Sequence, residues 1–127
     1  MDKKLNGQIA IITGSSSGIG AGCAKEMAKA GATVVVNYPV PGAKEMADAV
    51  VADIAANGGS AISYKCDVSK EDEVIQMFKD VIAQFGTVDI LVNNAYSAVN
   101  AIMANNGKPF WTYPYTFWDE VNNVGLR

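Results

Sequence analysis

The sequence predicts an α/β fold in which a parallel sheet of about four strands is covered by helices on both faces. Two observations lead to this prediction. Four short apolar runs alternate along the chain with three segments whose apolar residues recur at helical spacing. The first two runs are continuous, which is typical of strands buried on both faces. Such a regular succession favours right-handed crossovers between parallel strands.

The first strand is predicted over residues 9–13 (IAIIT), and a glycine- and serine-rich turn follows it. In the next helix Ile19, Cys23 and Met27 recur every four residues. We expect this stripe to face the sheet. The helix should end near Gly31, because glycine readily takes the left-handed conformation that terminates helices.

The second strand is predicted over residues 33–37 (TVVVN), which are rich in β-branched valine. Prolines at positions 39 and 41 then interrupt the chain. A second helix follows, stopped by residues 57–59 (NGG). Its predicted apolar face consists of Met46, Val50, Val51 and Ile54.

The third strand is predicted over residues 61–65, and a helix start comes soon after it. Ser69 and Asp72 have the spacing of a capping box, in which each side chain bonds the other residue's backbone N–H. Gly86 should end this helix, and residues 88–92 (VDILV) form the fourth strand. The predicted apolar face of the helix consists of Val74, Met77, Phe78, Val81, Ile82 and Phe85.

Composition argues against several function classes. The 127 residues suffice for one domain with a modest core. The net charge of −3, without a cluster of Lys or Arg, argues against nucleic acid or an anionic membrane as a partner. No apolar run approaches the ~20 residues of a membrane span. Histidine is absent and Cys23 and Cys66 stand far apart, so we expect no metal site and reduced thiols in a cytoplasmic protein.

The turn TGSSSGIG, residues 13–20, is the strongest functional signal. A helix N-terminus has unpaired amides and a partial positive charge, and both favour phosphate. Gly14 suits a tight turn, Gly18 a close approach of ligand to backbone, and Gly20 the packing of helix on strand. The serines at 15–17 offer hydroxyl donors. The spacing differs from GxGxxG and lacks the lysine of a P-loop. We interpret the segment as a phosphate-binding turn, with a merely flexible connection as the alternative.

Three motifs occur in order: the turn at 13–20, Cys-Asp-Val at 66–68 after the third strand, and Val-Asn-Asn-Ala at 92–95 after the fourth. Together they resemble the short-chain dehydrogenase/reductase family, over nearly the whole chain. The resemblance implies a Rossmann doubly wound parallel sheet and a bound NAD or NADP. Residues 1–127 would then be a dinucleotide-binding domain that is incomplete at its C-terminus.

The resemblance also implies roles for individual residues. Asp67 would accept a hydrogen bond from the adenine amino group, with Val68 against the ring; alternatively, Asp67 is only a polar residue preceding a helix. Asn94 and Ala95 would lie beside the nicotinamide ribose, whereas Asn93 would bond neighbouring loops and strands. The residues expected to line the pyrophosphate are Gly14, Ser16, Ser17, Gly18, Ile19 and Gly20.

Cofactor selection is expected at the end of the second strand, where a carboxylate would bond the ribose 2′-hydroxyl of NAD. Tyr38 occupies this acidic position, so a 2′-phosphate would meet no repulsion. Neither Ser17 nor Pro39 supplies the arginine that often binds this phosphate. We therefore favour NADP(H), with NAD(H) as the alternative.

The family's proton-transfer pair, a tyrosine and lysine spaced YxxxK, is absent from this sequence. We therefore predict no catalytic residue in this chain and no activity from it alone. Tyr96 replaces the family's usual glycine, and Gly125 stands where an active-site asparagine is usual; both features resemble one branch of the family. A group of aromatic residues could line a substrate pocket or pin a loop onto the sheet: Phe110, Trp111, Tyr113, Tyr115, Phe117 and Trp118.

Two functions fit these observations. The first is an NAD(P)-dependent oxidoreductase acting on a carbonyl or secondary alcohol, with a small-molecule substrate and a homo-oligomeric complete enzyme. In that case we expect residues 1–127 to be the N-terminal half of a longer reductase. The second is a non-catalytic protein that binds a nucleotide or pairs with a partner through its exposed edge strand.

Overall fold

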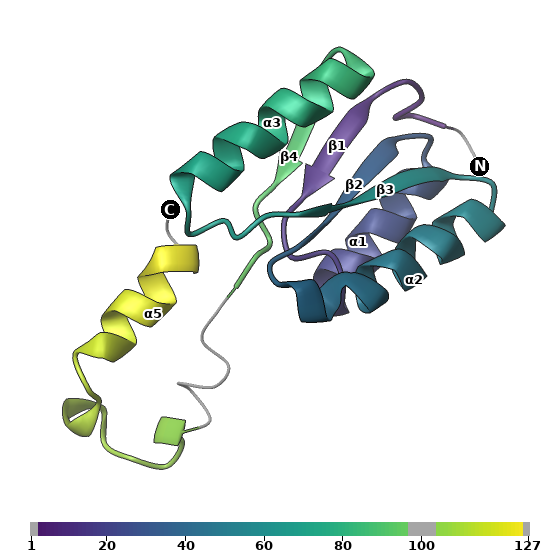
Figure 1. The fold of residues 1–127 in the computed structure, drawn as a ribbon. Helices are drawn as coiled ribbons and strands as arrows, with labels where there is room; N and C mark the ends of the chain where they lie inside the picture. Colours follow the sequence, from purple (N-terminus) through teal and green to yellow (C-terminus); the bar gives the residue numbers. More distant parts are fainter. Residues whose placement is uncertain (1–2, 97–103, 126–127) are drawn as a thin grey trace. The chain divides into compact units, whose positions relative to one another are not determined.

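The computed structural model describes residues 3–96 and 104–125 (Figure 1). The chain divides into two compact units, Met1–Asn94 and Ala95–Arg127, which are described separately. The first unit contains the sheet and its helices. The second contains a short 3₁₀ helix η2 (Phe110–Thr112) and helix α5 (Thr116–Gly125). Across the described ranges, no helix has both the length and the apolar character that a bilayer crossing requires.

The sheet contains four parallel strands, as predicted, and their order is β3-β2-β1-β4. Ile12 at the end of β1 is in register with Val36 of β2 and Val92 of β4. The carboxyl ends of these strands therefore lie along one edge of the sheet. The strands are β1 (Ile9–Ile12), β2 (Thr33–Tyr38), β3 (Ser60–Lys65) and β4 (Ile90–Val92).

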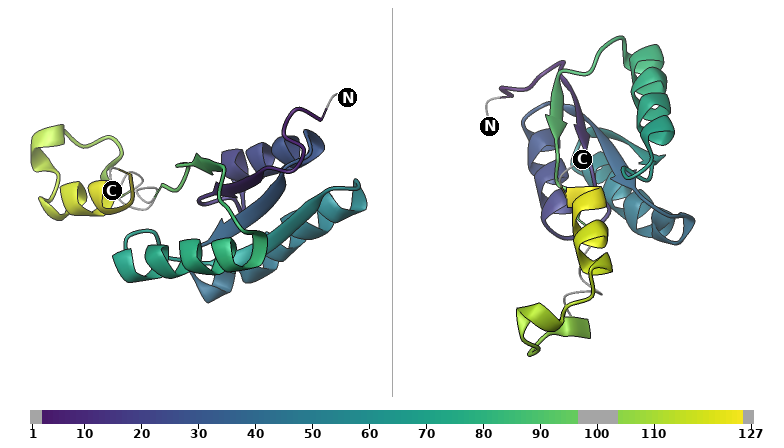
Figure 2. Two further views of the ribbon diagram at one scale, coloured as in Figure 1. Left: turned by 90° about the horizontal axis from the view of Figure 1, so that it is seen from above. Right: turned by 90° about the vertical axis from the view of Figure 1, so that its left-hand side faces the viewer.

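Helices cover both faces of the sheet, which confirms the doubly wound arrangement (Figure 2). One core lies between the sheet and helices α1 (Gly18–Lys29) and α2 (Lys44–Ala56). The other lies between the sheet and α3 (Glu71–Phe85). Side chains of β1 alternate between the two, because successive residues of a strand point to opposite faces. Ile12 packs in the first core and Ile11 in the second.

The predicted apolar stripe of α1 is confirmed in part: Cys23 and Met27 are partly buried and pack against the core, whereas Ile19 does not. Ile19 is 87% exposed, whereas the buried residues of the helix are Gly20, Ala24 and Ala28. Small residues on this face allow the helix to pack close to the sheet, and a larger stripe would hold it away. The buried positions of α1 therefore carry small side chains rather than the most hydrophobic ones.

The predicted faces of α2 and α3 agree better with the structure. Val50 and Ile54 of α2 are buried, as are Met77 and Val81 of α3. Two predicted members of these faces remain about half exposed, with 49% and 47% of their surfaces accessible: Met46 and Ile82.

The capping box predicted at the start of α3 does not form. The helix begins at Glu71 after Lys70, which makes no side-chain capping bond. The hydroxyl of Ser69 instead donates to Oδ1 of Asp67 at 2.7 Å. The Ser69 hydroxyl is therefore bonded to the nearby Asp67 carboxylate and does not cap the helix. The predicted stop at Gly86 is confirmed by its left-handed φ of +86°.

Candidate functional site

Most of the predicted site residues lie at or just after the carboxyl ends of the strands, and Figure 1 shows how these strands are arranged. The glycine turn follows β1, and Tyr38 ends β2. Asp67 follows β3, and Asn94 follows β4. Ligands of open α/β sheets bind at this edge, so the topology brings together motifs that are up to 80 residues apart.

The glycines of the turn have separate structural roles. Gly14 has φ of +64° and Gly18 has φ of +58°, a region that residues with side chains rarely adopt. A Cβ added to Gly20 would lie 2.6 Å from the carbonyl oxygen of Gly14 and 2.5 Å from Nδ2 of Asn94. The turn thus requires glycine at 14 and 18 for conformation, and at 20 for close packing.

The three serines of the turn are not equivalent. Ser15 is fully buried: its Oγ donates to the Ile12 carbonyl at 2.7 Å and accepts the Asn37 N–H at 3.0 Å. The prediction that Ser15 offers a hydroxyl to a ligand is therefore wrong. Ser17 is the exposed N-cap residue of α1, and its side chain makes no capping bond. Ser16 is 8% exposed. Within the described part of the chain, neither of these two hydroxyls has a hydrogen-bond partner.

The backbone amides of the turn divide into two groups. Gly14 N–H donates to Oδ1 of Asn37 at 2.9 Å, and Ser15 N–H donates to the Asn37 carbonyl at 3.0 Å. The five N–H groups from Ser16 to Gly20 have no acceptor among residues 3–96 and 104–125. The N-terminus of α1 therefore presents a row of unpaired donors with no carboxylate in its first turn. Such a row binds anions.

Asn37 is the main residue of the site that the sequence analysis missed. It is 1% exposed at the end of β2. Its Nδ2 donates to the carbonyls of Cys66 at 3.0 Å and Tyr64 at 3.4 Å, while its Oδ1 holds the turn. The signal that points to it is a single amide side chain near the end of an otherwise apolar strand.

One carboxylate oxygen of Asp67 is already hydrogen-bonded to a neighbouring residue, Ser69. Oδ1 accepts from the N–H of Ser69 at 3.0 Å and from its hydroxyl at 2.7 Å. The bond from the Ser69 hydroxyl lowers the pKa of this carboxyl below its ordinary value, so Asp67 is anionic at neutral pH. Oδ2 has no partner in the described ranges and remains able to accept. Val68 is half-buried and packs against the core on the α3 side of the sheet.

Asn94 takes the structural role predicted for Asn93. Its Nδ2 donates to the carbonyls of Thr13 at 3.0 Å and Gly14 at 3.2 Å. Asn93 is exposed and, among the described residues, makes no side-chain hydrogen bond. The Oδ1 of Asn94 accepts no hydrogen bond from the residues that the structure describes. Ala95 begins the second unit.

Tyr38 packs into the core on the α1 and α2 side and is 6% exposed. Tyr38 is the residue at the position where NAD selection was predicted. The end of β2 thus has a buried tyrosine there rather than a carboxylate.

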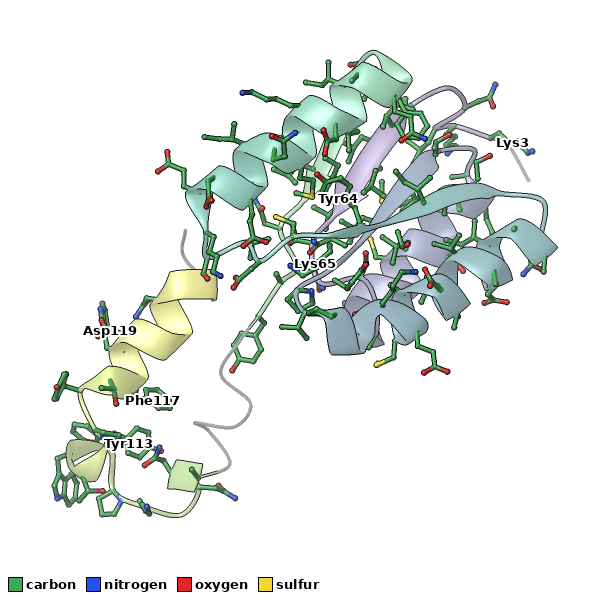
Figure 3. All side chains as sticks on the ribbon, in the orientation of Figure 1. Lys3, Tyr64, Lys65, Tyr113, Phe117 and Asp119 are labelled. Carbon is green, nitrogen blue, oxygen red and sulfur yellow. The ribbon has the colours of Figure 1, made fainter. Side chains whose placement is uncertain are left out.

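The second unit contains all six residues of the aromatic group. The rings of Tyr113 and Phe117 lie 5.0 Å apart, and both are labelled in Figure 3. Phe110 and Trp111 pack edge to face at 5.3 Å. Nδ2 of Asn122 donates to the Trp118 carbonyl one turn earlier in α5 at 2.7 Å. In the part of the chain that the structure describes, no cluster of His, Cys, Asp and Glu could hold a metal ion.

Comparison with known proteins places these features in a family. The model for short chain dehydrogenases matches residues 8–126. Human "Dehydrogenase/reductase SDR family member 1" is 43% identical over 128 residues, which cover all of this chain and 40% of the relative. The 3-oxoacyl-acyl-carrier-protein reductase FabG of Staphylococcus epidermidis is 48% identical over 119 residues, covering 93% of this chain and 45% of the relative.

Solved structures agree with the sequence comparisons. A metagenomic short-chain oxidoreductase in complex with NADP is 36% identical, with a TM-score of 0.79 over 95% of this chain and 51% of that one. The citronellol catabolism dehydrogenase AtuB of Pseudomonas aeruginosa is 28% identical, with a TM-score of 0.82 over 98% of this chain and 46% of that one.

The chain thus spans about half the length of these relatives, or less. The family match extends across the sheet, the glycine turn and both later motifs. This chain belongs to the short chain dehydrogenase family.

Proposed function

We propose that residues 1–127 are the dinucleotide-binding domain, incomplete at its C-terminus, of an NAD(P)-dependent oxidoreductase that acts on a carbonyl or secondary alcohol. The observation that carries the proposal is the row of N–H groups from Ser16 to Gly20 at the carboxyl edge of the sheet, which have no acceptor among the described residues. The related metagenomic oxidoreductase, whose structure is a complex with NADP, supports it.

The residues present fit a dinucleotide. The amides of the turn and the hydroxyls of Ser16 and Ser17 would hold the diphosphate, beside the exposed side chain of Ile19. The free Oδ2 of Asp67 would accept from the adenine amino group, with Val68 near the ring. Asn94 and Ala95 would contact the nicotinamide ribose. When bound, the nicotinamide supplies or accepts a hydride.

NADP(H) is the favoured cofactor and NAD(H) the alternative. A ribose 2′-phosphate carries extra negative charge, which a carboxylate at the end of β2 would repel. Asn37 and Tyr38 stand there instead. The complete enzyme would act on a small-molecule substrate as a homo-oligomer. Both cysteines are free, which supports a reducing compartment, the cytoplasm.

Calorimetric titration of the 127-residue chain with NADP⁺ and NAD⁺ tests the proposal. We expect saturable binding of both, with the lower Kd for NADP⁺. Ile19→Glu places a carboxylate beside the unpaired amides at an exposed position, and should weaken NADP⁺ binding about tenfold or more. Ile75→Glu, on the exposed side of α3, is the matched control and should leave the Kd unchanged. A folded chain that binds neither dinucleotide would contradict the proposal.

A non-catalytic role in binding a partner is the second candidate. It is favoured by β4, which forms an edge of the described sheet and leaves 46% of Leu91 exposed. Since the sequence has no YxxxK pair, the chain alone should not reduce a panel of carbonyl compounds with NADPH. Sedimentation of the chain with and without NADP⁺ separates the two: a monomer that binds NADP⁺ fits the first role, and concentration-dependent association without binding fits the second.

A further inference from the structure

We propose that Asn37 is a positioning residue that holds the glycine turn in the one conformation that aims its free amides at a diphosphate. This inference rests on the proposed dinucleotide function. It concerns a residue that does not itself face the ligand, because Asn37 is 1% exposed and all its polar groups are used within the protein.

Asn37 is bonded to the turn through both its side chain and its backbone. Its Oδ1 accepts the N–H of Gly14 at 2.9 Å. Its own N–H donates to Oγ of Ser15 at 3.0 Å, and its carbonyl accepts the N–H of Ser15 at 3.0 Å. The Nδ2 group anchors the side chain from the other direction, on the carbonyls of Cys66 at 3.0 Å and Tyr64 at 3.4 Å. Through this residue, β3 fixes the turn that follows β1.

These bonds determine which amides remain for a ligand. The N–H groups of Gly14 and Ser15 point back to Asn37, and Gly14 turns the chain with φ of +64°. The next five N–H groups, from Ser16 to Gly20, are left without an acceptor in the described ranges. Without the Asn37 amide, the partly buried Gly14 N–H and the buried Cys66 carbonyl would lose these hydrogen bonds. A rotation of the Gly14 peptide would then relieve the loss and redirect the amides that follow.

The residue type matters because the position needs an acceptor and a donor on one short side chain. Asparagine has both. Aspartate keeps the acceptor for Gly14, but its carboxylate would face the carbonyl oxygens of Cys66 and Tyr64. Alanine provides neither group. The side chain of Asp67 is held by Ser69 and keeps these bonds when Asn37 is changed, so changes at Asn37 should act on the diphosphate site more than on the adenine site.

The first test compares two ligands in the 127-residue chain. NADP⁺ contains the diphosphate, whereas adenosine has the adenine and its ribose but no phosphate. Asn37→Ala should raise the Kd of NADP⁺ at least about tenfold and change that of adenosine less than about threefold. Val35→Ala is the matched control, since Val35 is also fully buried in β2 but packs in the core on the α3 side. It should destabilise the fold and leave both Kd values of the folded protein unchanged.

The second test uses Asn37→Asp and pH, and it serves even where Asn37→Ala does not fold. When the aspartate is protonated, its O–H donates to the Cys66 carbonyl while its other oxygen accepts from Gly14. Affinity for NADP⁺, expressed relative to wild type at each pH, should be low near about pH 8 and recover toward about pH 5. A general loss of packing would not recover in this way.

Different results would overturn the proposed function and the inference about Asn37. If the folded wild-type chain does not bind NADP⁺, the proposed function fails and the inference about Asn37 fails with it. If wild type binds, the inference alone is overturned by either of two results: an Asn37→Ala Kd within about twofold of wild type, or equal weakening of both ligands. An Asn37→Asp variant whose relative affinity does not change with pH would also overturn it.

Discussion

Asn94 and Thr13 are joined by two hydrogen bonds across the carboxyl edge of the sheet. Nδ2 of Asn94 donates to the Thr13 carbonyl at 3.0 Å, and the Asn94 N–H donates to Thr13 Oγ1, also at 3.0 Å. The same Nδ2 reaches the carbonyl of Gly14 at 3.2 Å. One amide therefore ties the segment after β4 to the start of the glycine turn, next to the backbone bond from the Thr13 N–H to the Val92 carbonyl at 3.1 Å.

Asn94→Ala should destabilise the protein by about 1–3 kcal/mol, because it removes the hydrogen bonds from Nδ2 to two carbonyls of the turn. The free energy of unfolding in urea measures this. Asn93→Ala is the matched control: Asn93 is the exposed neighbour, and its loss should cost less than about 0.5 kcal/mol. Equal losses at the two positions would contradict the assignment of the structural role to Asn94.

Gly20→Ala should destabilise the protein by about 1–3 kcal/mol through overpacking. Its Cβ would lie 2.6 Å from the Gly14 carbonyl oxygen and 2.9 Å from the Ser15 Cα, and neither backbone atom can move freely. Gly22→Ala, two residues along the same helix, meets no atom within 4 Å and should stabilise by up to about 1 kcal/mol. Thermal or urea unfolding of both variants measures whether Gly20→Ala lowers and Gly22→Ala raises the free energy of unfolding.

Ser69→Ala should raise the pKa of Asp67 toward its ordinary value, because the Ser69 hydroxyl is the largest cause of the lowered pKa. A carboxyl whose pKa is lowered by folding contributes stability above its unfolded pKa, and this contribution is lost as pH falls through the folded pKa. The variant should therefore lose less stability on acidification than wild type. NMR titration of the Asp67 side-chain carbon measures the shift. Lys70→Gln removes a smaller influence and should produce a smaller rise.

Cys66 should react slowly with a disulfide reagent such as DTNB. It is fully buried, and burial raises the pKa of its thiol to about 11. Cys23 is partly exposed, so its reaction at pH near ~8 should be at least about tenfold faster. Cys23→Ser and Cys66→Ser separate the two reactions. Rapid modification of Cys66 in the folded chain would show that this edge of β3 opens readily.

Much of the fold could be predicted from local patterns. The four strands, their parallel arrangement and the stop at Gly86 follow from short-range alternation and turn chemistry, and the structure confirms them. The face of α1 could not be read in the same way. Periodicity identifies Ile19 as a core residue, but Ile19 is exposed; the buried positions are Gly20, Ala24 and Ala28, with Cys23 and Met27 partly buried against the same core.

For the candidate site, the sequence by itself determined which segments reach the carboxyl edge, because motif order and strand alternation are properties of the chain. Only the tertiary structure decided how the polar groups pair. It assigned Ser15 and Asn94 to internal bonds, gave Ser69 to Asp67 rather than to a capping box, and revealed Asn37. Hydrogen-bond partners are set by distances between residues that lie far apart in sequence, and no local pattern encodes those distances.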